Sequence, residues 1–322
     1  MNGDPNFNSM LLAWLALFGG LAMLTSGGEL LVSGAVKLAK RWGMSSLLIG
    51  LTIVAFGTSL PELFVGLIAL FQDHPDILTG NVVGSNIANV GLILGISALI
   101  VPLPVKFKSV DLELYGILGA TVLLAFVSWL GIFPRILGLF FVAAIALYTI
   151  MSFRQASKNK LPLDEEPVVD TTKNFFSLPV ISGLIIGGFI LLGIGSNLFI
   201  NGAVDIARHF GISELIIGLT LAAIGTSLPE LASCLAAIRQ RQTEILTGNI
   251  IGSNLFNLLM VLGFCGLLKP FTLSPHLLTR DLPVMFSLSA VLIPILVVQQ
   301  GLMRHHGLIL LFSYAAYLFI LR

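Results

Sequence analysis

The sequence of residues 47–63 is LLIGLTIVAFGTSLPEL, and residues 215–231 repeat it as LIIGLTLAAIGTSLPEL. A second pair of segments follows with unchanged spacing, ILTGNVVGSNIAN at 77–89 and ILTGNIIGSNLFN at 245–257. Each copy of the first segment carries one carboxylate, Glu62 or Glu230, in the middle of an apolar run. A duplicated helix that bears a carboxylate and is interrupted by Gly and Pro is typical of transporters with an ion site at the repeat interface.

The composition indicates a polytopic membrane protein. The 322 residues are 56% hydrophobic and 10% charged, with a mean hydropathy of +1.00, whereas a soluble protein has roughly 25% charged residues. Too few polar groups remain to cover a surface that faces water. The net charge of +1 gives no indication of nucleic-acid binding. The only two cysteines, Cys234 and Cys265, lie in apolar segments, so we expect small core residues rather than a disulfide framework or a metal site.

The first ten residues, MNGDPNFNSM, contain no Lys or Arg, and the apolar run after them is longer than a signal-peptide core. We therefore expect the first segment to remain as a membrane helix. A crossing helix needs about 20 apolar residues. Ten stretches meet this length: 11–33, 44–70, 77–101, 112–130, 133–152, 177–200, 212–238, 245–268, 281–299 and 303–321.

The predicted fold is an all-α membrane protein with two inverted five-helix repeats and broken helices at the midplane. Residues 1–152 form the first repeat, 153–176 a cytoplasmic linker loop and 177–322 the second repeat. We expect the second and third segments of each half to be broken, because Gly, Pro, Ser, Thr and Asn interrupt them. Since five segments per half is an odd number, the second copy must cross the membrane in the opposite sense, which suits alternating access around a midplane site.

Basic residues set the orientation. With the N-terminus outside, twelve lie in inside loops: Lys37, Lys40, Arg41, Lys106, Lys108, Arg154, Lys158, Lys160, Lys173, Arg239, Arg241 and Arg304. Five lie outside: Arg135, Arg208, Lys269, Arg280 and Arg322. This bias predicts that both termini are outside and that the 153–176 loop is cytoplasmic. The absence of a targeting segment, the short loops and the minimal length suggest a bacterial or archaeal inner membrane.

The two glutamates of the repeated motif are the decisive feature. The other fourteen acidic residues lie in loops, in the N-terminal tail or near predicted helix ends, among them Glu29, Asp111, Glu113, Asp205 and Glu214. A carboxylate inside the membrane needs a partner and is a functional candidate by default. No Lys or Arg lies deep enough to pair with Glu62 or Glu230. The missing counter-charge must come from bound cations or protons.

Oxygen donors surround both glutamates. One helical face carries Ala55, Thr58, Ser59 and Glu62, and its copy carries Ala223, Thr226, Ser227 and Glu230. Pro61 and Pro229 lack an N–H, so carbonyls around 55–58 and 223–226 become available as ligands. The pairs Ser85 and Asn89, and Ser253 and Asn257, add further oxygens.

All of these donors are hard oxygens, and none of the five histidines is central, so zinc and copper are disfavoured. Calcium takes 6–8 oxygens, and two bidentate glutamates with two carbonyls would supply about six. Sodium suits smaller subsets, and magnesium would keep its water shell. Small-residue packing is an alternative role for Ser59, Ser85, Ser227 and Ser253. Asn81, Asn86, Asn249 and Asn254 could equally cap the broken helices.

The motifs GTSLPE with GNVVGSNIAN, and GTSLPE with GNIIGSNLFN, resemble the alpha-repeats of the cation/calcium exchanger superfamily, most closely prokaryotic sodium/calcium exchangers. The resemblance implies a site in which Glu62 and Glu230 bind both calcium and sodium, with Thr58 and Thr226 as main-chain calcium ligands. It places sodium at Ala55, Ser59 and Ser85 and at Ala223, Ser227 and Ser253, with Asn89 and Asn257 in the middle. Some relatives have an aspartate at one middle position, whereas this chain has asparagine at both.

The resemblance further implies an antiporter that exchanges three sodium ions for one calcium ion by alternating access, with electrogenic calcium export. Calcium and sodium are then transported substrates rather than cofactors. No catalytic residue is expected, and the chain is not predicted to be an enzyme. The expected partners are these ions and the lipid bilayer, with no nucleic acid, and the chain is expected to be a monomer.

Four alternatives remain open from the residues. Protons could neutralise the glutamates in a calcium/proton exchanger, although the doubled hydroxyl and amide positions favour sodium. A potassium-dependent sodium/calcium exchanger is a further possibility. A cation channel suits two inverted broken helices less well than alternating access. An intramembrane enzyme is disfavoured because no convergent His, Lys or Cys accompanies the glutamates.

Overall fold

The computed structural model describes residues 7, 9–158, 177–211 and 225–320. Predicted features in 1–6, 159–176 and 212–224, including Glu214, Ala223 and most of the linker loop, lie outside the described residues. Within them, eight helices are long and apolar enough to cross a membrane. Two further apolar helices are α12 (Leu228–Arg239) and α16 (Arg304–Ile320). The protein is thus an all-α membrane protein, as the sequence predicts.

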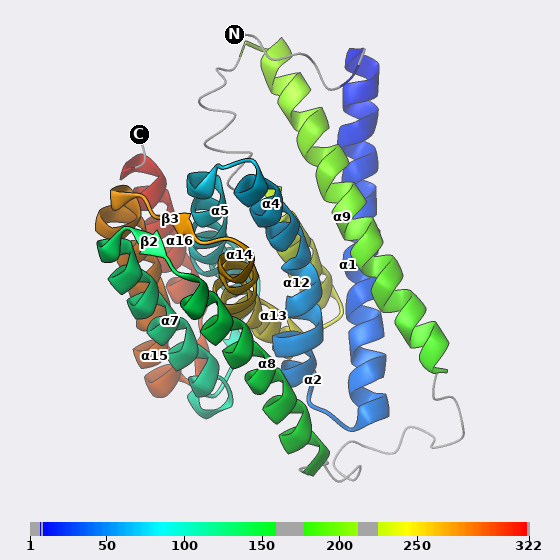
Figure 1. The fold of residues 1–322 in the computed structure, drawn as a ribbon. Coiled ribbons are helices and arrows are strands. Elements are labelled where there is room, and N and C mark those ends of the chain that lie inside the picture. The colour runs from blue at the N-terminus through cyan, green and yellow to red at the C-terminus, as the bar shows by residue number, and fades with distance from the viewer. Residues whose placement is uncertain (1–6, 8, 159–176, 212–224, 321–322) are drawn as a thin grey trace.

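The first helices of the two repeats lie side by side and antiparallel (Figure 1). They are α1 (Met10–Trp42) and α9 (Leu178–His209). Their backbones approach closely because glycine recurs along the seam: a Cβ added at Gly27 would lie 2.9 Å from the Leu192 nitrogen, and one at Gly188 would lie 2.8 Å from the Leu31 nitrogen. Two equivalent helices that run in opposite directions show directly that the repeats are inverted.

The second helix of the first repeat is broken at the GTSLPE motif. It consists of α2 (Ser46–Ile49), the π-helical turn η1 (Gly50–Val54), α3 (Ala55–Thr58) and α4 (Leu60–Phe71). Ser59, with φ −82° and ψ −1°, interrupts the helix, and Pro61 opens the next one, where a missing N–H costs least. In the second repeat, Thr226 and Ser227 form a turn before α12 begins. The prediction of a broken second helix is confirmed in the first repeat, and in the second repeat the described residues, which resume at 225, show the equivalent turn.

The third helices are continuous, which corrects the prediction that they are broken. In the first repeat α5 (Pro75–Ala88), η2 (Asn89–Leu94) and α6 (Gly95–Ile100) follow without a gap. In the second, α13 (Thr243–Phe256), η5 (Asn257–Val261) and α14 (Leu262–Leu268) do the same. These segments contain Gly, Ser and Asn but no internal proline, so each backbone widens into one π-helical turn without breaking.

The remaining helices complete each repeat. In the first repeat they are α7 (Asp111–Leu130) and α8 (Arg135–Lys158), with a short 3-10 turn η3 (Phe107–Ser109) before them. In the second repeat the π-helical turn η6 (Leu277–Asp281) leads into α15 (Leu282–Gln299), and α16 follows. Both termini of the described helices, the start of α1 and the end of α16, lie on one side of the molecule, and the end of α8 and the start of α9 lie on the other (Figure 1).

Two short strand pairs join the repeats on opposite sides of the molecule. β1 (Leu103–Pro104) pairs with β4 (Gly301–Leu302), and β2 (Ile132–Phe133) pairs with β3 (Phe271–Thr272), both antiparallel. Each pair takes one strand from each repeat. An exposed ion pair between Asp73 and Lys269 adds a further link between the repeats.

The duplication extends to backbone conformation. Asp73, after α4, has φ 60°, and Arg241, after α12, has φ 57°. These residues occupy equivalent positions of the two repeats, between the duplicated motifs, and both are non-glycine residues in the left-handed region, which is uncommon. The repeats therefore share local backbone geometry as well as sequence.

Glu29 does not lie at a helix end, which corrects its predicted placement. Helix α1 continues well past it to Trp42, because its apolar and small residues extend the helix beyond the predicted span. Glu29 instead forms an ion pair of 3.0 Å with Arg239 at the end of α12. Cys234 and Cys265 are free and buried, as predicted.

Candidate cation site

Glu62 and Glu230 lie at the starts of α4 and α12, directly after the two helix breaks, and neither side chain is exposed to solvent (both 0%). They are close enough to repel each other electrostatically. None of their four carboxylate oxygens accepts a hydrogen bond from the described residues. Two buried, mutually repelling carboxylates without a donor are unstable as anions unless a cation or proton joins them.

Burial alone does not distinguish these glutamates, because Glu113 and Asp205 are also buried. Glu113 lies in the first turn of α7 and Asp205 near the end of α9, close to helix ends as predicted. The difference lies in partners. Tyr148 donates to Glu113 at 2.7 Å, and the Phe7 backbone nitrogen donates to Asp205 at 2.8 Å.

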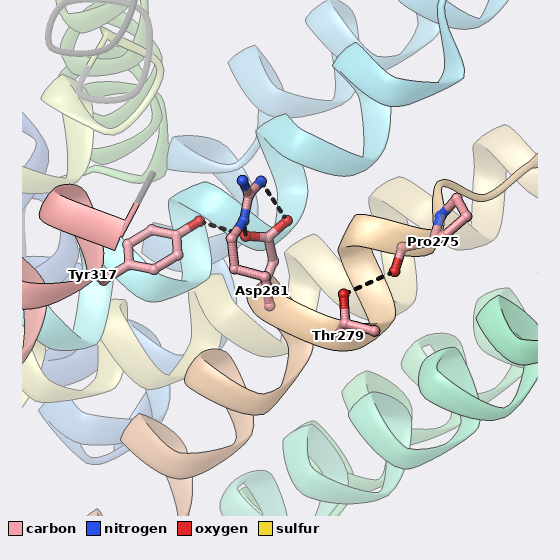
Figure 2. Close-up of polar contacts among 5 residues, drawn as sticks. Pro275, Thr279, Asp281 and Tyr317 are labelled. Carbon is pink, nitrogen blue, oxygen red and sulfur yellow. Dashed lines mark hydrogen bonds and ion pairs between the residues drawn. The ribbon is translucent and has the colours of Figure 1, made fainter. Parts of the chain in front are cut away.

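Asp281, at the end of η6, shows the same contrast (Figure 2). Arg280 donates to its Oδ1 at 2.8 Å, and the Tyr317 hydroxyl donates to the same oxygen at 3.1 Å. Neighbouring Thr279 donates to the Pro275 carbonyl at 3.3 Å. The carboxylate of Asp281 is thus neutralised within the protein, whereas those of Glu62 and Glu230 are not.

Each threonine of the GTSLPE motif contacts the opposite repeat. The Thr58 hydroxyl lies 3.0 Å from Oδ1 of Asn249 and 3.1 Å from the Ser253 hydroxyl. In the other half, the Thr226 hydroxyl lies 3.1 Å from Oδ1 of Asn81 and 3.2 Å from the Ser85 hydroxyl. The structure therefore joins the two motifs across the repeat interface in a pseudo-symmetric way.

These contacts place two hydroxyls beside each glutamate. Ser85 and Thr226 face Glu62, and Ser253 and Thr58 face Glu230. Each carboxylate is thus accompanied by a serine of its own repeat and a threonine of the other. The cluster offers carboxylate, hydroxyl and amide oxygens, which is the donor set that calcium and sodium prefer.

Asn81 and Asn249 hold the half-helices that carry the glutamates. The Asn81 amide donates to the Glu62 carbonyl at 3.2 Å. In the second repeat Ser233 intervenes: the Asn249 amide donates to the Ser233 hydroxyl at 2.9 Å, and that hydroxyl donates to the Glu230 carbonyl at 2.9 Å. Position 65, the equivalent of Ser233, is a valine. Sequence reasoning missed Ser233 because the duplication does not preserve it.

Ser59 and Ser227 are buried, and their hydroxyls have no hydrogen-bond partner among the described residues. Asn257 is equally buried, and both polar atoms of its side chain lack a partner. Asn89 donates through Nδ2, and its Oδ1 has no partner. Unsatisfied polar atoms inside a protein are costly and require a reason. Ser97, Ser128 and Ser289 also carry unpartnered buried hydroxyls, but most of the unpartnered atoms in the described part of the chain belong to the duplicated motifs, which indicates a site that receives its missing partners from outside the chain.

Two of the carbonyls expected as ligands already accept hydrogen bonds. The Ala55 carbonyl accepts from the Ser59 backbone nitrogen at 3.0 Å, and the Gly225 carbonyl accepts from the Ser196 hydroxyl at 2.9 Å. The Ala55 carbonyl also accepts a long hydrogen bond from the Thr58 hydroxyl at 3.4 Å, so both of its lone pairs have a partner. Ser196 is a residue that sequence reasoning missed, because its equivalent in α1 is glycine.

Comparisons with known proteins agree with this geometry. The family model for sodium/calcium exchanger protein matches residues 12–154 and 180–322 separately. The chain is 37% identical over 286 residues to inner membrane protein YrbG of Escherichia coli, covering 88% of both chains. It is 33% identical over 345 residues to the sodium/calcium exchanger MaX1 of Methanosarcina acetivorans, covering 96% of this chain and 98% of that one.

Among solved structures, the sodium-calcium exchanger NCX_Mj soaked with Na+ and Sr2+ matches with a TM-score of 0.81 and 30% identity, over 98% of this chain and all of that one. A structure of the same exchanger soaked without Na+ and Ca2+ also has a TM-score of 0.81. With both halves matched by the family model and near-complete coverage by relatives, the chain belongs to the sodium/calcium exchanger family of membrane transporters, which carry calcium and sodium as substrates and are not enzymes.

Proposed function

We propose that this protein is a secondary-active antiporter that exchanges sodium for calcium by alternating access. The observation that carries the proposal is the pair Glu62 and Glu230: two buried carboxylates from inverted half-helices, with hydroxyls around them and no cationic partner among the described residues. A cation that enters this cluster supplies the missing positive charge and coordinates the unpartnered oxygens.

In this proposal both glutamates bind calcium and sodium in turn. The main-chain carbonyls of Thr58 and Thr226 complete the calcium site. Two flanking sodium sites and the middle of the cluster use the remaining small residues: Ala55, Ser59, Ser85 and Asn89 from the first repeat, and Ala223, Ser227, Ser253 and Asn257 from the second.

Competition for the same carboxylates supplies the coupling. One calcium ion or a set of sodium ions neutralises the two negative charges, and only a neutralised site passes through the low-dielectric interior as the repeats switch between outward- and inward-open states. With three sodium ions per calcium ion, one net charge crosses the membrane per cycle, which is worth about 2.3 kcal/mol per 100 mV. A cell that is negative inside then drives calcium export.

Sodium is favoured over protons as the coupling ion by the donors that accompany the carboxylates. Protons need only the two glutamates, whereas the doubled Ser85 and Ser253 hydroxyls, which lie beside them, suit a bound metal cation. Potassium dependence is not favoured, because the two middle positions are asparagines, so the site has two carboxylates rather than three.

The membrane arrangement follows the distribution of basic residues. We place both termini outside and the 153–176 loop in the cytoplasm of a prokaryotic cell with the protein in its inner membrane. The arrangement of helix ends on two sides of the molecule is compatible with this placement (Figure 1). Residues 1–152 and 177–322 serve as the two repeats, and one chain forms the working transporter.

The proposal is tested with Glu62→Gln and Glu230→Gln in purified protein. Both variants should fold, judged by size-exclusion profile and thermal unfolding, but should lose calcium flux, since an amide cannot neutralise a divalent cation. Glu113→Gln is the matched control. It is also a buried glutamate, but Tyr148 already pairs with it, so flux should persist. Normal calcium flux in either Glu62→Gln or Glu230→Gln would refute the proposal.

A further inference from the structure

The Gly-Ser-Asn segments at residues 84–86 and 252–254 form hydrogen bonds with each other across the repeat interface. Asn86 and Asn254 are equivalent residues, 168 positions apart, and both are buried. The side-chain amide of Asn86 donates to the Asn254 carbonyl at 3.1 Å, and the side-chain amide of Asn254 donates to the Asn86 carbonyl at 3.3 Å. This reciprocal pair, the asparagine clasp, fixes α5 against α13. Neither residue caps a broken helix, which was one expectation from the sequence.

The symmetry of the clasp ends at the next polar atoms. Nδ2 of Asn89 donates to Oδ1 of Asn254 at 3.0 Å. The equivalent bond in the other half would run from Asn257 to Oδ1 of Asn86, but it is not formed. Oδ1 of Asn86 and both polar atoms of the Asn257 amide have no partner among the described residues. The two middle asparagines therefore differ in their surroundings although their sequences are duplicated.

A backbone carbonyl determines which way the Asn89 amide points. The Asn86 carbonyl can only accept, so the Asn254 atom that faces it must be Nδ2, and the opposite atom must be Oδ1. Because that Oδ1 can only accept, the Asn89 atom beside it must be Nδ2. The remaining atom of the Asn89 amide is thus its oxygen, which is buried and unpartnered. Asn89 lies one turn after Ser85, on the same helical face, and Ser85 faces Glu62.

We infer that Asn254 is a positioning residue that makes the two middle asparagines unequal. It holds Asn89 with its oxygen available to a cation, while Asn257 has no such restraint and adopts whichever amide orientation the bound ions require. The inference rests on the proposed function, because it assigns an oriented oxygen to the calcium and sodium cluster of that site.

The test uses a double-mutant cycle on calcium binding, measured with calcium-45 by equilibrium dialysis on the full chain in detergent. Asn254→Ala should weaken calcium binding about tenfold, because the Asn89 amide can then rotate its nitrogen toward the ions. Asn89→Asp carries an oxygen on both branches and needs no orientation. In that background the same Asn254→Ala change should not weaken calcium binding, because the carboxylate introduced at position 89 donates no hydrogen bond to Oδ1 of Asn254 and loses nothing when that side chain is removed.

Asn86→Ala is the matched control. It removes one bond of the clasp but leaves the bond between Asn89 and Asn254 in place, so calcium affinity should stay within about twofold of wild type. If Asn254→Ala does not fold, Asn254→Ser replaces it. Serine keeps a polar group at this position, but its side chain is shorter than that of asparagine and should not hold the Asn89 amide.

A purely structural clasp predicts a different pattern. An equal loss of calcium affinity on Asn254→Ala in the wild-type and Asn89→Asp backgrounds would overturn the positioning role, as would unchanged affinity in both. Failure of the proposed function is separable from either result: in that case the wild-type protein, before any substitution is made, would either not bind calcium-45 or bind it without competition from sodium.

Discussion

The hydroxyl of Thr58 lies 3.0 Å from Oδ1 of Asn249, so the break in the second helix of one repeat is bonded to the third helix of the other. Thr226 makes the equivalent bond to Asn81 at 3.1 Å. Both threonines also contact a serine that faces a buried glutamate. Hydrogen bonds therefore link the helix break of each repeat to the third helix of the other repeat and to the serine hydroxyls beside the buried glutamates.

Replacing Thr58 or Thr226 by valine should destabilise the protein by about 1 kcal/mol, since a buried amide oxygen then loses a donor. The main-chain carbonyls proposed as calcium ligands would remain, so calcium flux should fall only a few-fold. The measurement is thermal unfolding together with flux. Thr79→Val is the control, because the Thr79 hydroxyl donates only within α5, to the carbonyls of Pro75 and Asp76. If Thr79→Val has an equal effect, the cross-repeat bonds contribute nothing particular.

Calcium should strongly stabilise the wild-type protein against heat. Removing divalent ions and sodium leaves Glu62 and Glu230 as unpartnered carboxylates in repulsion. Calcium at one hundred times its dissociation constant should restore about 2.7 kcal/mol. Glu62→Gln should instead unfold at a higher temperature than wild type without ions and respond weakly to calcium. A wild-type melting temperature that does not change between chelator and calcium would contradict this.

Ser85→Ala and Ser253→Ala should separate sodium from calcium. Each substitution removes a hydroxyl assigned to a flanking sodium site, so the half-saturating sodium concentration should rise about fivefold, equivalent to roughly 1 kcal/mol. Half-saturation by calcium should change less than about twofold, because the carboxylates and carbonyls remain. Ser97→Ala is a suitable control, since Ser97 is a buried serine later in the same continuous helix. Equal shifts for both ions would argue against separate sodium sites.

Gly27→Ala should impair the seam between α1 and α9. Its Cβ would lie about 3 Å from the α9 backbone at Leu192 and Gly188, and overpacking of this kind costs about 1–3 kcal/mol. Gly19→Ala, on the same helix with nothing within 4 Å of the added carbon, should be neutral. Thermal unfolding and flux of both variants provide the comparison. Wild-type behaviour of Gly27→Ala would mean that the two helices separate freely at this position.

Much of the fold was predictable because the same helix motifs occur in both halves of the sequence. The duplicated GTSLPE segments gave the broken second helices, because proline and the preceding turn residues act locally. The third helices were mispredicted, since Gly, Ser and Asn weaken a helix without removing a backbone donor, and Asn89 and Asn257 only widen it into a π-helical turn. The extension of α1 beyond Glu29 could not be read from hydropathy, which records span length rather than helix length.

The sequence predicted the site residues that occur in both repeats, but not those that occur in one repeat only. Glu62 and Glu230 stood out because charge inside an apolar run is rare. Ser196, Ser233 and the unequal bonds of Asn89 and Asn257 have no duplicated signal, and they depend on which side chains the packed repeats bring together. The hydrogen bond from Tyr148 to Glu113 depends in the same way on the tertiary fold, because it joins residues 35 positions apart that no local pattern relates.

The most direct test of sodium/calcium exchange is calcium-45 uptake into proteoliposomes loaded with sodium, with the sodium and pH gradients varied independently. We predict uptake that rises with the outward sodium gradient, is unaffected by the pH gradient and is lost in Glu62→Gln. Uptake that follows the proton gradient and ignores sodium would contradict the account, because the glutamates would then exchange calcium for protons and the hydroxyls beside them would bind no sodium.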